Sequence, residues 1–185
     1  VTGVQTCALP ILASGTLSPP PDDRVFEEYA RLCEGTKEAG FEHYEVSNFA
    51  RPGGRSRHNS AYWNGTPYLG IGPGAHSFLD GRRWWNARSN ARYLKAAAAG
   101  NFPGQQEAET LGAQDRFNEA LITGLRRIEG VDPAHLLQQT GVDVTAQPAL
   151  QGRLDSGRCE WVDGRLRIPE AKWPLGDAIT LDLMV

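Results

Sequence analysis

The sequence predicts an α/β fold for its first half and a small α+β domain for its second half. A helical pattern that ends at Gly40 and a β-rich run at 41–49 are typical of the repeating half of an α/β unit. After residue 110, three helical patterns precede Asp163-Gly164, which lies between two strand-like runs and signals a tight hairpin. Three helices and a hairpin have a winged-helix-like outline, so we expect that architecture in the C-terminal part.

Length and composition are those of a globular protein. The 185 residues, 40% of them hydrophobic, can form one large domain or two small ones. No apolar run approaches the ~18 residues of a membrane-spanning helix, and a net charge of -3 suggests no general affinity for nucleic acid. Cys7, Cys33 and Cys159 are far apart and form neither a disulfide framework nor a CxxC metal pair. We therefore expect a cytoplasmic protein without a transmembrane segment.

Residues 1–12 differ from the rest of the chain. They begin VTGVQTCALPI, with no initiator Met and no basic leader, and Pro10 interrupts the apolar run, so a signal peptide is not predicted. The stretch is similar to the in-frame translation of a sequencing adapter. We interpret it as an adapter-derived artefact and expect the remainder to be an N-terminally truncated fragment of a longer protein.

The first helix is expected to end near Gly40. Asp22 or Asp23 can cap it, because a short carboxylate accepts the free N–H groups of a first helical turn. An apolar stripe recurs at helical spacing and is expected to be buried: Val25, Phe26, Tyr29, Leu32 and Cys33. The following strand ends near Glu45 and Ser47, where α/β folds gather functional groups, although ordinary strand polarity is the alternative for both.

Residues 51–95 are basic and aromatic. They hold eight basic residues against one acidic residue, and seven of the sixteen aromatic residues. Guanidinium groups bind carboxylates or phosphates, and aromatic faces stack on flat rings. The segment therefore suits a flat anionic ligand such as a porphyrin, a nucleotide or single-stranded nucleic acid. The alternative is a folded loop with solvated arginines and an aromatic core.

A histidine of this segment is a candidate metal ligand. His58 follows Arg57 and precedes Asn59, Tyr62 and Trp63, which gives an axial ligand, an orienting amide and a stacking wall. A purely structural histidine is the alternative.

The glycine-rich run at 68–78, YLGIGPGAHSF, partly fits the G-x-G-x-x-A pattern of dinucleotide sites. Pro73 inside the turn and the lack of a helical pattern after His76 argue against such a site. We expect a strand that runs into a glycine turn, where the backbone closely approaches a ligand or a neighbouring strand. His76 can support the turn structurally.

The remaining elements follow from local signals. Ser89 or Asn90 can cap a helix that ends at Gly100, and the run at 101–110 is expected to be a linker. Four apolar residues predict the next helix: Phe117, Leu121, Ile122 and Leu125. Asp132-Pro133 opens another, and a third segment covers 149–154. From residue 110 onward, eight basic residues face eleven acidic ones, so partner docking is favoured over DNA binding.

Three stretches carry a resemblance to a known family: YEVSNFARPG (44–53), RHNSAYW (57–63) and YLGIGPGAHSF (68–78). They resemble the second half of the radical-SAM haem chaperones, HemW-type proteins long labelled as oxygen-independent coproporphyrinogen III oxidases. The H-N-x-x-Y-W motif at His58 marks the chaperone branch, where it is associated with haem binding. Coproporphyrinogen III oxidases lack that motif.

The resemblance implies a fold, ligands and partners. The fold is the terminal part of a partial TIM-like radical-SAM barrel at 13–80, then a linker and helix at 81–109, and a helical, winged-helix-like domain at 110–185. The implied ligands are haem, a 4Fe-4S cluster and S-adenosylmethionine, and the implied partners are haem-accepting proteins, including membrane-bound respiratory proteins. Besides the haem-binding group, which includes His58 as metal ligand, the candidate cofactor-binding residues are Glu45, Ser47, Ile71 and Gly72.

One feature of the family is missing from the sequence. Radical-SAM proteins hold their cluster with a CxxxCxxC triplet, which this sequence lacks, and Cys33 and Cys159 cannot replace three converging thiolates. We therefore assign no catalytic residue and expect no cluster binding by the chain itself. A haem-binding chaperone is the favoured function, and the alternatives are an oxidative decarboxylase of coproporphyrinogen III and a nucleic-acid-binding winged-helix protein.

Overall fold

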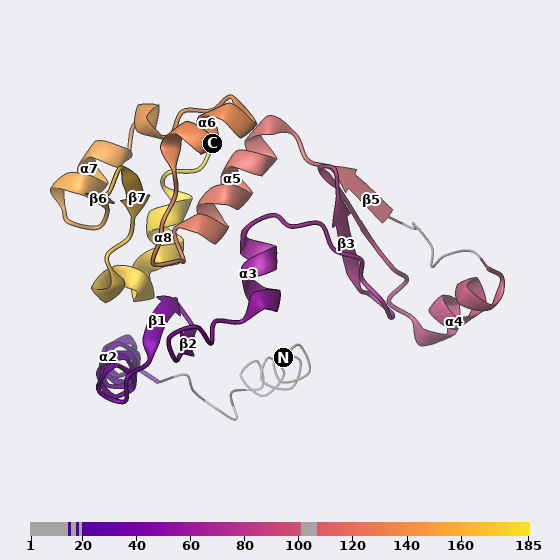
Figure 1. Cartoon of the computed structure of the whole chain (residues 1–185), viewed down its shortest axis with the longest axis horizontal. Coiled ribbons are helices and arrows are strands. Elements are labelled where there is room, and N and C mark those ends of the chain that lie inside the picture. Colours follow the sequence, from indigo (N-terminus) through magenta and orange to yellow (C-terminus); the bar gives the residue numbers. More distant parts are fainter. Residues whose placement is uncertain (1–14, 16–17, 19, 101–106) are drawn as a thin grey trace. The chain divides into compact units, whose positions relative to one another are not determined.

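The computed structural model describes residues 15, 18, 20–100 and 107–185 (Figure 1). The chain forms two compact units, divided between Phe41 and Glu42, and each is described here by itself. The predicted artefact at 1–12, with Cys7, lies outside the described residues, as does 101–106 of the predicted linker. None of the described helices is both long enough and apolar enough to cross a membrane.

The first unit contains helix α2 (Asp22–Glu38), which ends as predicted but begins differently. Its N-cap is Pro21, without a side-chain capping bond, so the prediction of Asp22 or Asp23 as cap is wrong. Both carboxylates lie in the first turn instead, where their negative charges interact favourably with the positive end of the helix dipole. The C-terminal end is confirmed, because Gly40 has a positive φ of 77° and its N–H donates to the Lys37 carbonyl.

The apolar stripe of α2 is not buried, contrary to the prediction. The helix has no buried residue, and Val25, Phe26 and Leu32 are 46%, 39% and 51% exposed. The reason is that α2 is the sole regular element among the described residues of its unit. Spacing predicts the face of a helix that can be covered, but not the element that covers it.

The second unit begins with a hairpin and a three-stranded sheet. Strands β1 (Glu42–Glu45) and β2 (Asn48–Ala50) pair antiparallel, so the strand predicted at 41–49 is two strands with a turn between them. Strands β3 (His76–Leu79), β4 (Arg82–Trp85) and β5 (Glu107–Thr110) form an antiparallel sheet in that order. Residues 107–110 are therefore a strand and not part of a linker, because the β4 edge pairs with them.

Two helices lie between these strands in the sequence. Helix α3 (Arg57–Trp63) carries the H-N-x-x-Y-W motif, and helix α4 (Asn90–Ala98) follows β4. The Ser89 hydroxyl accepts the Arg92 N–H at the start of α4, as predicted.

The C-terminal elements that follow α5 lie along one side of it (Figure 1). In chain order they are α5 (Ala113–Gly124), α6 (Pro133–Thr140), a 3-10 turn (Val144–Ala146), α7 (Leu150–Asp155), β6 (Glu160–Val162), β7 (Arg165–Arg167), a second 3-10 turn (Glu170–Leu175) and α8 (Gly176–Leu181). The predicted cap at Asp132 and the predicted hairpin at Asp163-Gly164 are confirmed. The Asp132 carboxylate accepts the His135 N–H at 3.0 Å, and Asp163 and Gly164 both have the positive φ of a type I′ turn.

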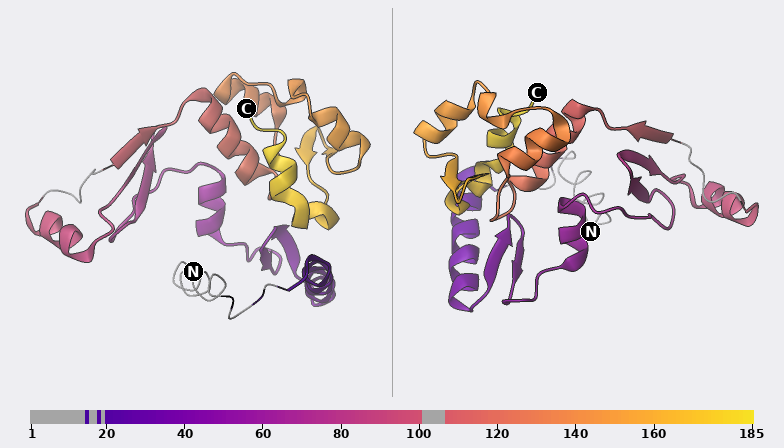
Figure 2. Two further views of the ribbon diagram at one scale, coloured as in Figure 1. Left: turned by 180° about the vertical axis from the view of Figure 1, so that it is seen from behind. Right: turned by 45° about the horizontal axis from the view of Figure 1, so that its top comes forward.

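The core of the second unit lies between α5 and the elements after it. Phe117 and Leu121 of α5 are fully buried, together with Leu166 of β7, Trp173 and Leu183. Figure 2 shows the same grouping of α5, α6 and α8 from two further sides. The mixed α/β content is confirmed. The barrel remnant, the winged-helix outline and the domain boundaries stay predictions, although the β3-β4-β5 sheet spans the boundaries at 80/81 and 109/110.

Candidate haem-binding site

Helix formation brings the histidine of the motif against a tyrosine. The Ser56 hydroxyl caps α3 by accepting the Asn59 N–H at 3.2 Å, which starts the helix one residue before the motif. His58 and Tyr62 are then four residues apart on one helix face, with ring centroids 4.8 Å apart at 90°. His58 is exposed, so its imidazole is accessible from solvent. The structure therefore places two of the predicted haem-binding residues, His58 and Tyr62, in contact with each other.

The other motif residues face the β1–β2 hairpin. The Asn59 amide donates to the Asn48 side-chain oxygen at 3.1 Å, and the Trp63 ring lies 6.0 Å from the Tyr44 ring, centroid to centroid. The amide nitrogen of Asn59 therefore attaches α3 to the hairpin. Contacts of Asn59, Trp63 and the exposed Arg57 with a ligand stay predictions.

Glu45, a predicted cofactor-binding residue, is buried, and its carboxylate is hydrogen-bonded within the protein. Its carboxylate accepts hydrogen bonds from the Ser47 backbone N–H at 3.0 Å, the Asn48 amide at 2.5 Å and the Arg126 Nε–H at 3.0 Å. The Ser47 residue itself is exposed. This arrangement agrees with the structural alternative for Glu45, because both carboxylate oxygens already have protein partners.

Three side chains hold the glycine turn. The Asn86 amide donates to the carbonyls of Gly70 at 3.2 Å and Gly72 at 2.9 Å. The Ser77 hydroxyl accepts the Gly70 N–H, and the Tyr93 hydroxyl accepts the Gly72 N–H. Both polar backbone groups of Gly72 thus have protein partners, so its contact with a cofactor stays a prediction.

The side chain between these glycines lies in solvent. Ile71 is 82% exposed, and its contact with a cofactor also stays a prediction.

A cleft of about 850 Å³ adjoins the motif. On one side it is lined by the rings of Tyr62, Tyr68 and Phe78; the Tyr62 and Tyr68 centroids are 4.5 Å apart. Burial raises the pKa of the Tyr68 phenol, so that side chain stays neutral at physiological pH. Arg83 of β4 forms ion pairs with Glu109 of β5 and Glu119 of α5, and its charge is thereby neutralised.

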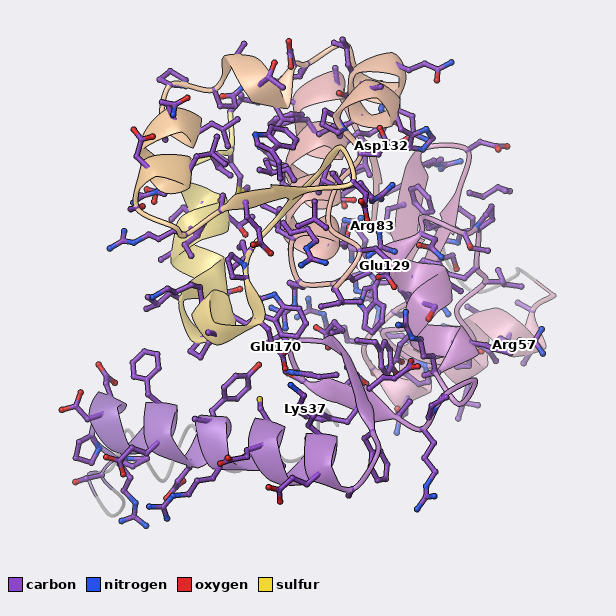
Figure 3. All side chains as sticks on the ribbon, turned by 60° about the vertical axis from the view of Figure 1, so that its left-hand side comes forward. Lys37, Arg57, Arg83, Glu129, Asp132 and Glu170 are labelled. Atoms are coloured by element: carbon purple, nitrogen blue, oxygen red, sulfur yellow. The ribbon has the colours of Figure 1, made fainter. Side chains whose placement is uncertain are left out.

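The opposite wall comes from α5, α6 and the segments beside them, which the sequence motifs do not include. Arg116, Arg127, His135 and Arg165 line this wall, 53 or more residues after Trp63 in the sequence. No local motif marks them. Basic residues within the acidic C-terminal part are the one signal that could have found them. In Figure 3, Arg57 lies away from Arg83, Glu129 and Asp132.

The cysteines do not fit an iron–sulfur cluster. Cys159 is buried, and burial raises the pKa of its thiol to about 11, so it is protonated at neutral pH. Cys33 belongs to the first unit. Three converging thiolates are therefore absent from the part of the chain that the structure describes.

Comparisons with known proteins place the chain among radical-SAM proteins. No family profile matches the sequence. The haem chaperone HemW of Mycobacterium tuberculosis (strain H37Rv) is 38% identical over 122 residues, which are 66% of this chain and 31% of that protein. HemW of Bacillus subtilis is 30% identical over 71% of this chain and 34% of its own length. The mitochondrial radical S-adenosyl methionine domain-containing protein 1 of Danio rerio is 35% identical over 80% of this chain and 38% of its own length.

A solved structure shows the same fold. Coproporphyrinogen III oxidase (HemN) from Escherichia coli, described as a radical SAM enzyme, matches with a TM-score of 0.64 at 19% identity. The match covers 90% of this chain and 42% of that one. The chain spans about a third of the length of the HemW relatives. On these relationships, the chain belongs to the HemW-type radical-SAM family.

Proposed function

We propose that the chain is part of a cytoplasmic haem-binding chaperone, which delivers haem to acceptor proteins such as membrane-bound respiratory proteins. The observation that carries the proposal is the contact of His58 with Tyr62, which itself lines the 850 Å³ cleft. A cleft of this volume lies in the range that holds cofactor-sized ligands. An imidazole nitrogen is a common axial ligand of haem iron. The relatives named HemW support the same function.

Haem is the cargo in this proposal, and the residues have separate roles. His58 binds the iron, Tyr62 covers a face of the ring, and Trp63 with Asn59 fixes the helix that carries them. Arg57 is exposed beside His58 and can approach a propionate from solvent. We place these groups at the end of a TIM-like barrel remnant that precedes a winged-helix-like domain.

The 4Fe-4S cluster and S-adenosylmethionine belong to the longer family members. Neither Cys33 nor Cys159 can supply a cluster ligand set, so no step of the proposed function passes through the cluster in this chain. Glu45, Ser47, Ile71 and Gly72 are proposed to contact the cofactor in those longer family members.

The test is a haem titration of the whole chain. For wild type we expect a shifted Soret band, and for His58→Ala a band close to that of free haem with binding weaker by about tenfold or more. His76→Ala and His135→Ala are matched controls, since His76 stacks on Trp85 and His135 lines the far wall of the cleft. Loss of the band with His135→Ala alone would make His135 the axial ligand and would contradict the proposed role of His58.

A second candidate function is oxidative decarboxylation of coproporphyrinogen III. The fold similarity to the Escherichia coli enzyme favours it, although at 19% identity that similarity shows the fold alone. A full-length family member that carries both the cysteine triplet and the H-N-x-x-Y-W motif provides the test. Robust formation of protoporphyrinogen by that protein would favour the enzyme over the chaperone.

A further inference from the structure

The connector between α5 and α6 is fixed in place by β1 and by Val46, the residue after it. The Val46 N–H donates to the Arg126 carbonyl at 3.0 Å, and the Ile128 N–H donates to the Tyr44 carbonyl at 3.1 Å. These bonds lie on both sides of Arg127, so the backbone position of that residue is defined by strand-like pairing.

The same connector is held from the β7 side. The Arg165 guanidinium donates to the carbonyls of Glu129 at 2.8 Å and Gly130 at 3.1 Å, and Arg167 donates to the Ile128 carbonyl at 3.1 Å. Arg165 also lies 3.5 Å from a carboxylate oxygen of Asp132. These two arginines therefore serve the protein's own carbonyl and carboxylate groups.

Arg127 differs from its neighbours because no carboxylate pairs with it. The structure shows no ion pair of Arg127 with any acidic group in its described segments, and its buried Nε–H has no hydrogen-bond partner there. Glu129 acts on Arg127 electrostatically, but its ion pair is with Arg55. Burial lowers the pKa of Arg127, yet a guanidinium stays charged in proteins. A half-buried cation without an ion-pair partner is costly, so a ligand anion would stabilise it.

Arg127 is bonded to the end of α3 and lines the same cleft as the aromatic residue Tyr62. Its Nη1 donates to the side-chain oxygen of Asn64, the C-cap residue of α3, and Arg127 and Tyr62 both line the cleft. Arg83 is neutralised by two glutamates, and Arg116 is exposed, where water screens its charge. Among the arginines that line the cleft within the described segments, Arg127 is thus the half-buried one that has no carboxylate partner.

We propose that Arg127 is a specificity-determining residue of the cleft and binds a carboxylate arm of a flat ring that packs against Tyr62. A guanidinium matches a carboxylate with paired N–H donors, and such charge-assisted bonds are strong where water is partly excluded. The inference rests on the proposed function and deepens it, because it requires the free acid of the porphyrin and not the ring alone.

The test compares protoporphyrin IX with its dimethyl ester, followed by porphyrin fluorescence. The metal-free ring is used because its binding does not need an axial histidine. Wild type should bind the free acid about tenfold to a hundredfold more tightly than the ester, since esterification removes the carboxylate charge. Arg127→Gln should lose that preference while binding the ester as wild type does, and Arg127→Lys should keep part of it.

The matched control is Arg158→Gln, which makes the same change at an exposed arginine that does not line the cleft. It should bind both porphyrins as wild type does. Thermal unfolding by circular dichroism shows whether each variant is folded, and Arg127→Lys gives the answer if Arg127→Gln is unstable.

The outcomes separate this inference from the proposed function. If haem binds in a His58-dependent way but acid and ester bind equally to wild type, the role of Arg127 is overturned and the chaperone proposal stands. If the preference for the free acid depends on Arg127 but the Soret band does not depend on His58, the role of Arg127 stands and the proposed role of His58 in haem binding is overturned. If wild type binds neither porphyrin nor haem, both are overturned.

Discussion

At the scale of single residues, Glu45 connects the helix with His58 to the end of α5. Asn59 of α3 bonds Asn48, which bonds Glu45, which accepts a hydrogen bond from Arg126. Arg126 immediately precedes Arg127, the residue proposed to bind the carboxylate of the porphyrin. A buried carboxylate with three donors is therefore a positioning residue for both walls of the candidate site.

Arg126 offers a direct comparison of a buried and an exposed partner. Its Nε donates to Glu45, which is 3% exposed, and its Nη1 donates to Asp177, which is 91% exposed. We expect Glu45→Gln to lower the free energy of unfolding by about 2 kcal/mol, because hydrogen bonds to a buried charge are lost. Asp177→Asn should cause no measurable change, since water screens an exposed pair. Urea denaturation of both variants is the measurement, and equal losses would contradict the assigned role of Glu45.

The sequence predicted part of this arrangement. Glu45 was identified as a polar residue at a strand end, and His58 with Tyr62 as parts of one motif. Arg126 is 81 residues from Glu45, and a contact over that separation follows from the packing of α5 and not from any local pattern. Local signals could not predict it.

At the scale of elements, the glycine turn before β3 shows close approach to a neighbouring strand. A Cβ on Gly70 would lie 2.1 Å from the His76 carbonyl oxygen, so no side chain fits there. This agrees with one of the two alternatives left open by the sequence: at Gly70 the backbone closely approaches the neighbouring strand β3.

Gly70→Ala should therefore destabilise the β3-β4-β5 sheet by about 1–3 kcal/mol, because the backbone must move to accept the methyl group. Gly152→Ala is the control, since Gly152 lies in helix α7 with no atom within 4 Å of its would-be Cβ. That change should be neutral or stabilising, as alanine favours a helix. Chemical denaturation of both proteins measures the difference. A Gly70→Ala protein as stable as wild type would show that the turn is not constrained by β3.

Apart from the cap at Asp22 or Asp23, elements with short-range signals were predicted well, and those that depend on partners were not. Ser89, Asp132-Pro133 and Asp163-Gly164 each act within a few residues, and all three were confirmed. The edge strand β5 was predicted as linker, because pairing with β4 requires a partner more than twenty residues away.

At the scale of the whole molecule, the cleft combines residues from distant parts of the second unit. Tyr62 and Tyr68 come from the segment with the motif, whereas Arg127 and Arg165 come from the C-terminal core. The binding site therefore depends on the stability of that core. Its buried cluster runs from Phe117 to Leu183, and the partly buried residues packed against it also belong to the second unit.

We accordingly expect residues 42–185 to fold without the first unit. The fragment should unfold cooperatively at the same urea midpoint as the whole chain, because α2 contributes no buried residue. Tryptophan fluorescence measures the transition, since all five tryptophans, including buried Trp173, lie within 42–185. Phe117→Ala is the comparison: Phe117 is fully buried, and its truncation should cost about 3–5 kcal/mol and lower the midpoint of both proteins equally. A midpoint clearly lower for the fragment than for the whole chain would mean that the first unit stabilises the core, and haem binding would then have to be measured on the intact chain alone.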